Sequence, residues 1–168
     1  VYTLNFNASG AGNTALGYTA LKNNSSGDHN VAVGVNALLN NETGSNNVAN
    51  GWLSLYYNTN GEENSAFGHQ SLYFNVSGFY NTASGSGSLY SNTASNNTAA
   101  GYKSLYSNTT GSDNTASGKL SMYSNTTGTG NTATGTSALS TNVTGSKNTA
   151  NGFQTLFMNK TGSNNTAN

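Results

Sequence analysis

The sequence lacks several residues on which folded proteins commonly rely. It has no cysteine and no proline, and only 6% of its 168 residues are charged. The absence of cysteine excludes disulfide bonds and thiolate metal sites. Five lysines balance five carboxylates, so no basic stripe is present to neutralise nucleic-acid phosphates or anionic lipid headgroups. No apolar run approaches the roughly 20 residues of a membrane-spanning helix. We therefore expect neither nucleic-acid binding nor membrane insertion.

The residues that are abundant are asparagine, threonine, serine and glycine. Apolar residues make up 33% of the chain, below the 45–50% of typical domains. Such a composition would often indicate disorder, but disordered chains usually carry a high net charge and few aromatic residues. This chain has zero net charge, ten tyrosines, six phenylalanines and one tryptophan. An ordered fold without a large apolar core is therefore expected.

A repeated motif, Asn-(Thr/Val/Ser)-Ala-x-Gly, runs along the chain. Successive copies are 17 residues apart, except for one step of 16. The glycines of the motif are Gly17, Gly34, Gly51, Gly68, Gly85, Gly101, Gly118, Gly135 and Gly152. Each repeat continues with a small residue and a leucine or methionine, then an asparagine, and usually a second, closing glycine. A fixed short period of this kind is the signature of a solenoid.

A 17-residue unit is too short for two packed helices but suits one coil of a β-solenoid. We predict an all-β, elongated rod formed by residues 1–168 as a single repeat domain of about nine coils. With coils about 4.8 Å apart, the rod would be roughly 45 Å long. Each coil would hold two short strands, or one strand and a helical turn, because the spacing in Gly101–Asn108 also fits a helical turn. Both glycine columns are expected at corners with positive φ.

One repeat is irregular, because residues 93–96 are one residue short and lack the closing glycine. We expect an altered corner there and an uninterrupted stack. The repeat is already running at the start of the sequence and still running at Asn168. The chain therefore reads as a segment of a longer fibre.

The asparagine after each leucine allows two interpretations. Stacked asparagines can form an interior ladder, because the side chain carries both a donor and an acceptor. Several also precede a serine or threonine by two residues, which is the acceptor pattern for N-glycosylation. The candidates for modification are Asn41, Asn75, Asn108, Asn125, Asn142 and Asn159. The interior ladder is the favoured interpretation.

An aromatic column follows the leucines and is the main candidate surface for assembly or ligand binding. Its members are Tyr56, Tyr73, Tyr90, Tyr106, Tyr123 and Phe157. Three roles are open: stacking between coils, packing against another chain, and stacking on sugars. A threonine column, from Thr14 to Thr166, could instead order water at an ice surface, but valine and serine interrupt it.

No residues recur in the pattern of a catalytic or metal site. Asp28, His29, Glu62, Glu63 and His69 could meet across coils, but they occupy variable columns and are expected to be surface residues. Metal sites need several ligands in a defined geometry. We therefore predict no enzyme activity, no metal and no cofactor.

The repeats resemble those of bacterial and phage tail-fibre-domain proteins. The stretches that carry this resemblance are Asn97–Gly111 and Asn114–Gly128, with the pattern N-T-A-x-G-x-x-S-(L/M)-Y-S-N-T-T-G. Asn30–Gly34 is also similar to the head repeats of trimeric autotransporter adhesins. The resemblance implies a structural or adhesive fibre outside the cell, on a cell surface or on a virion. The chain would associate with itself, as a trimer or filament, and would bind cell-surface glycans if adhesive. The alternative is a solenoid that binds ice or glycans.

Overall fold

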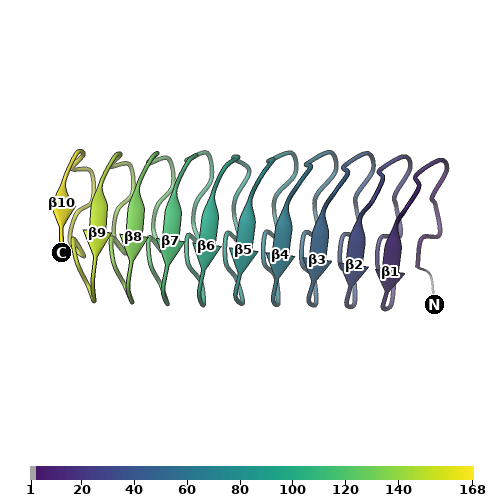
Figure 1. The fold of residues 1–168 in the computed structure, drawn as a ribbon, viewed down its shortest axis with the longest axis horizontal. Coiled ribbons are helices and arrows are strands. Elements are labelled where there is room, and N and C mark those ends of the chain that lie inside the picture. The colour runs from purple at the N-terminus through teal and green to yellow at the C-terminus, as the bar shows by residue number, and fades with distance from the viewer. Residues whose placement is uncertain (1–2) are drawn as a thin grey trace.

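The computed structural model describes residues 3–168 as a rod of stacked coils, with the first and last described coils at opposite ends of the rod (Figure 1). Each coil contributes one short strand to a single ten-stranded sheet. The strands are β1 (Thr14–Leu16), β2 (Val31–Val33), β3 (Val48–Asn50), β4 (Ser65–Phe67), β5 (Thr82–Ser84), β6 (Thr98–Ala100), β7 (Thr115–Ser117), β8 (Thr132–Thr134), β9 (Thr149–Asn151) and β10 (Thr166–Ala167). Strands that are neighbours in the chain pair in parallel, from β1 to β10. The predicted all-β solenoid is confirmed.

The coils are bonded to one another on both sides of the rod. In the sheet, each repeat position faces its own copy, so that Ala116 pairs with Ala133. On the opposite wall, the amides of Lys103, Leu105 and Ser107 donate to carbonyls of neighbouring coils. Backbone amides that bond to neighbouring coils cannot also form the local hydrogen bonds of a helix. Residues 3–168 accordingly contain no helix. The helical turn that the spacing of Gly101–Asn108 allowed therefore does not form, and each coil has one strand only.

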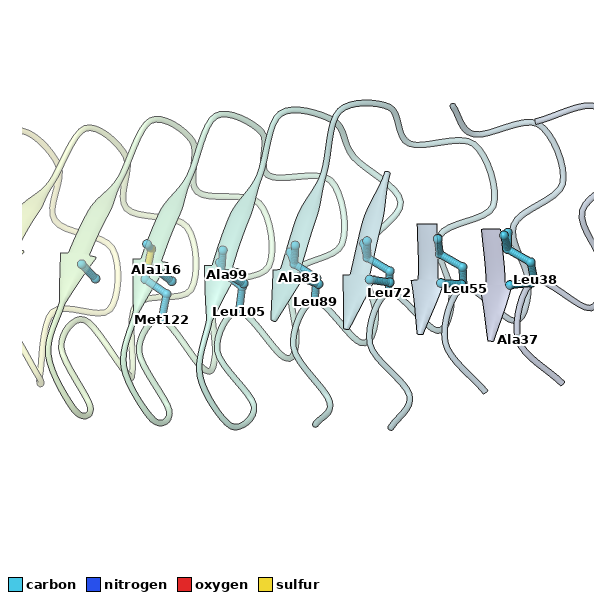
Figure 2. Close-up of a cluster of buried hydrophobic side chains, with 14 of the residues drawn as sticks. Ala37, Leu38, Leu55, Leu72, Ala83, Leu89, Ala99, Leu105, Ala116 and Met122 are labelled. Carbon is cyan, nitrogen blue, oxygen red and sulfur yellow. The ribbon is translucent and has the colours of Figure 1, made fainter. Parts of the chain in front are cut away.

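The interior is a thin layer between these two walls. The central alanine of each strand points inward and meets the leucine column of the opposite wall, as Ala99 and Leu105 show in Figure 2. Both side chains are fully buried. The leucine column has positive φ throughout, for example 50° at Leu105 and 47° at Met122. This conformation is unfavourable for residues with a side chain. Burial of a leucine, worth about 1.5–3 kcal/mol, offsets that cost.

Two ladders of buried asparagines line the interior. In the first, the side-chain amide of Asn41 donates to the side-chain oxygen of Asn24 and to the carbonyl of Gly44, each at 2.8 Å. In the second, the backbone amide of Asn131 donates to the side-chain oxygen of Asn114 at 3.0 Å. Within residues 3–168, every buried side-chain nitrogen and oxygen has a hydrogen-bond partner. The ladders thus satisfy polar groups that the thin core would otherwise leave unpaired.

The two glycine columns serve different purposes. The glycine after each strand has the expected positive φ, for example 133° at Gly118. The closing glycines do not, so the prediction of positive φ was wrong for this column. A side chain at Gly111 would instead overlap the carbonyl oxygen of Gly128 and come within 2.7 Å of the Asn108 side-chain oxygen. Close stacking of the coils, rather than backbone conformation, requires glycine there.

The short repeat alters one corner and leaves the stack intact. Strands β5 and β6 pair across it, with Thr82 opposite Thr98. The carbonyl of Ala94 takes the place of the closing glycine carbonyl, and it accepts bonds from the side-chain amides of Asn81 and Asn92, each at 2.8 Å. One residue can therefore be lost from a corner without loss of either asparagine ladder.

Candidate functional site: an aromatic ladder along the rod

The five tyrosines of the aromatic column form a continuous stack on one side of the rod. Centroids of neighbouring rings are 5.3, 5.1, 4.8 and 5.4 Å apart, and their planes differ by 2–11°. The stack contains Tyr56, Tyr73, Tyr90, Tyr106 and Tyr123. The ring spacing follows the spacing of parallel strands, about 4.8 Å, because each tyrosine occupies the same position in its coil.

A second, shorter aromatic column lies beside the first. Tyr57 and Phe74 stack on each other with centroids 5.2 Å apart, and each meets neighbouring ladder rings edge to face. This column is aromatic in only two consecutive repeats, so the repeat pattern did not predict it. The consecutive pairs Tyr56-Tyr57 and Tyr73-Phe74 were the available signal.

Phe157 is not part of the ladder. Ser140 occupies the aromatic column between Tyr123 and Phe157, and Phe157 forms no ring pair with another described residue. The surface predicted from the sequence is therefore continuous only from Tyr56 to Tyr123. The ladder ends where serine interrupts the column.

The geometry of the stack limits what it can bind. Each inner ring has both faces covered by its neighbours, so the half-buried tyrosines turn edges rather than faces toward solvent. Sugars stack on ring faces, and only the outer faces of Tyr56 and Tyr123 lie outside the stack. Burial raises the pKa of Tyr73 and of Tyr90, and the neighbouring tyrosines raise both further. Both effects favour the neutral form of these two phenols.

One cation lies against the ladder. The amine of Lys103 is 5.1 Å from the ring centroid of Tyr106 and 5.4 Å from that of Tyr102. A side-chain hydrogen bond with Tyr102 and the neighbouring tyrosine charges raise the pKa of Lys103. In the preceding coil, a side chain at Gly87 would come within 3.2 Å of the Lys103 side chain. The absence of a side chain at Gly87 leaves space for the side chain of Lys103.

The glycosylation candidates lie in the first asparagine ladder. Asn41, Asn75, Asn108, Asn125 and Asn142 are fully buried, and Asn159 is half-buried. All six use the side-chain nitrogen, to which a glycan would be attached, as a donor within the ladder. The interior column has no room for a sugar in the folded chain. The structure thus shows the ladder that the sequence favoured.

The charged residues considered for a metal site are spread over the surface. Asp28 is half-buried and accepts a hydrogen bond from the backbone amide of Ala11, while His69 stacks on Trp52 with centroids 4.9 Å apart. His29, Glu62 and Glu63 are exposed. Residues 3–168 contain no group of three histidines or carboxylates placed to hold a metal ion, and no pocket.

The threonine column presents hydroxyl groups on the outer face of the sheet. From β5 to β9 the first residue of each strand is an exposed threonine, and these hydroxyls have no hydrogen-bond partner among the described residues. Some corner threonines differ, because Thr109 and Thr126 each donate a side-chain bond to a carbonyl of the next coil at 3.0 Å. The sheet face therefore carries an unbroken row of free hydroxyls from β5 to β9.

Comparison of the chain with protein-family models, curated proteins and solved structures found no significant match. No helix suited to crossing a membrane occurs in the part of the chain that the structure describes.

Proposed function

We propose that this chain is a stiff segment of a structural or adhesive fibre outside the cell, on a cell surface or on a virion. The observation that carries the proposal is the unbroken bonding between coils. Asparagine side-chain bonds link every coil to the next, from the bond between Asn24 and Asn7 to the bond between Asn165 and Asn148. Solenoids of this kind derive their stability from contacts between neighbouring repeats, which suits a rod of extendable length.

The interior asparagines also support a role in resisting tension along the rod. Each corner is held by side-chain bonds to its own coil and to the adjacent coil, so that stretching the rod must break several bonds at once. The aromatic ladder adds stacking contacts on the outside, worth about 0.5–1.5 kcal/mol per pair beyond area burial. The resemblance to tail-fibre repeats points in the same direction.

Light scattering combined with negative-stain microscopy tests the proposal. We expect rods whose length grows by about 4.8 Å for every repeat added to the array. Arrays of one and two copies of residues 13–164 give the direct comparison. A compact particle whose length does not change with repeat number would contradict the fibre role.

The free hydroxyls of β5–β9 favour a second candidate, a sheet face that orders water and binds ice. The measurement is thermal hysteresis, with Thr115→Lys as the disrupting variant. Lys is long and charged, so it would break the flat row of hydroxyls without entering the interior. Absence of hysteresis in the unsubstituted chain would exclude this candidate and leave the fibre proposal standing.

A further inference from the structure

The charges of this chain are separated along its length. Residues 1–84 carry one lysine and four carboxylates, a side-chain charge of −3, whereas residues 85–168 carry four lysines and one carboxylate, a charge of +3. Because the coils stack in chain order, this separation makes one half of the rod acidic and the other half basic. The zero net charge of the chain hides this polarity.

Most of these charges share one edge of the rod. We define the corner loops as the segments between the two asparagine ladders. From Asn24 onward there are nine of them, counted in chain order: 25–29, 42–46, 59–63, 76–80, 93–96, 109–113, 126–130, 143–147 and 160–164. The uncharged segment 8–12 precedes them and has no counterpart in the pairing described below. The first three contain all four carboxylates of the acidic half, the sixth contains Asp113, and the last two contain Lys147 and Lys160. The corner loops thus form an edge that is acidic at one end and basic at the other.

The middle of the same edge is apolar. The fourth corner loop exposes Val76, Phe79 and Tyr80, which are 42%, 38% and 59% accessible to solvent. The fifth corner loop, residues 93–96, is the shortened one. Its residues are small or polar, and it lies directly beside the most apolar corner loop. Exposed aromatic residues flanked by charged ones are typical of protein contact sites.

We propose that two copies of this chain pair side by side and antiparallel through their corner loops, with the two-fold axis at residues 93–96. This pairing rests on the proposed fibre function and names the partner. It places the second corner loop opposite the eighth, and the first opposite the ninth. Glu42 then faces Lys147 of the other copy, and Asp28 faces Lys160. Phe79 and Tyr80 of each copy face the sixth corner loop of the other, residues 109–113, next to its shortened corner.

Charge selects this arrangement over the alternatives. A parallel, in-register pair or trimer would set Glu42, Glu62 and Glu63 against their own copies, and like charges across an interface are costly. The antiparallel pair sets no like charges opposite each other, because the third corner loop faces the uncharged residues 126–130 and the sixth, which contains Asp113, faces the uncharged residues 76–80. An isologous pair also closes on itself, so it adds width to a fibre without uncontrolled growth.

Sedimentation and light scattering of the full chain test the pairing. We expect dimers at low ionic strength that weaken at about 1 M salt, where charges are screened beyond about 3 Å. Glu42→Lys should weaken the dimer about tenfold, because the two-fold axis makes two repulsive pairs from one substitution. Adding Lys147→Glu to the same chain should restore it, since the charges are then exchanged rather than lost. Lys119→Glu, at an exposed position outside the corner loops, is the matched control and should have no effect.

A spin label at a single introduced cysteine reports the orientation. The chain has no cysteine, and Ser26 is exposed, so Ser26→Cys gives one labelled site per copy. The first and ninth corners are eight coil steps apart, so an antiparallel pair separates the two labels by about 40 Å. A parallel pair would bring them close together and overturn the proposal.

The apolar centre is tested with Tyr80→Ser, which should convert dimers to monomers. Tyr102→Ser, at an exposed position outside the corner loops, serves as its control. A chain that stays monomeric at all concentrations, or a dimer unaffected by these substitutions, overturns the pairing. Single rods that lengthen with repeat number would in that case leave the fibre function intact.

Discussion

The side-chain amide of Asn125 donates a hydrogen bond to the side-chain oxygen of Asn108 at 2.7 Å. Both residues are fully buried, and the same contact recurs from coil to coil along the rod. An asparagine can act in such a column because it accepts from one neighbour while it donates to the other. An aspartate has no donor and would bring a charge into the interior.

This relationship predicts the effect of Asn108→Asp. The substitution removes the donors to Asn92, at 2.7 Å, and to the carbonyl of Gly111, at 2.8 Å. A buried charge without a partner typically costs about 3–5 kcal/mol. Urea unfolding followed by circular dichroism should show a loss of that size at neutral pH. Asn151→Asp is the matched control at an exposed strand position and should stay within about 0.5 kcal/mol of the unsubstituted chain. Equal losses for the two variants would refute a structural role for the ladder.

Two glycine substitutions test whether steric crowding or backbone conformation explains the glycine at the closing position. Gly111→Ala should destabilise the rod by about 1–3 kcal/mol or more, because the added methyl group meets the Gly128 carbonyl of the next coil. Gly130→Ala is the contrasting variant. Gly130 has a φ of 64°, but the nearest atom to an added methyl group is 3.8 Å away.

The measured difference between these two glycine variants decides the point. We expect Gly130→Ala to cost only the left-handed conformation, about 1–2 kcal/mol. If Gly111→Ala proved the milder of the two, close stacking of the coils would not be the reason for glycine at the closing position.

The positive φ of the leucine column predicts an effect that side-chain volume alone would not predict. Leu105 is buried at a φ of 50°, where β-branched residues are strongly disfavoured. Leu105→Val should therefore cost more than the 0.5–1.5 kcal/mol usual for loss of one buried methylene group. Leu105→Met should cost less than about 1.5 kcal/mol, because it conserves volume and Met122 already occupies the same column. Thermal unfolding of the two variants in parallel is the measurement. Equal effects would show that backbone conformation does not constrain this column.

The period of the sequence was sufficient to predict the solenoid and its asparagine ladders. Inward columns vary little, and Ala99 and Asn108 belong to columns that are constant along the chain. The reason for each constant residue was harder to infer. Gly118 and Gly111 are constant for different reasons, one conformational and one steric, and a sequence shows both only as glycine.

The outward positions were the least predictable from the sequence. The column of Tyr57 and Phe74 varies from coil to coil. Its stacking beside the tyrosine ladder is therefore evident only from the folded structure. The same holds for the charged edge. Glu42 and Lys147 are far apart in the sequence, and their places at equivalent corners appear only once the coils are stacked.

The tyrosine ladder predicts a sensitivity to alkaline pH. Burial raises the pKa of Tyr73 and of Tyr90, with further contributions from neighbouring tyrosines. Unfolded tyrosines ionise near pH 10, so above that pH the unfolded chain loses protons that the folded chain retains. The stabilisation from these two residues is therefore complete below about pH 10 and decreases as the pH rises further.

Two substitutions test this dependence. Tyr73→Phe and Tyr90→Phe keep the stacked rings but remove the ionisable groups, so the double variant should lose less stability than the unsubstituted chain above pH 10. Tyr18→Phe, at an exposed position outside the ladder, controls for the loss of a phenol elsewhere. Urea midpoints at neutral pH and above pH 10 give the comparison. If the double variant declined as steeply as the Tyr18→Phe control, ionisation of the ladder would not be the cause of alkaline unfolding, and the decline would have to arise from other groups.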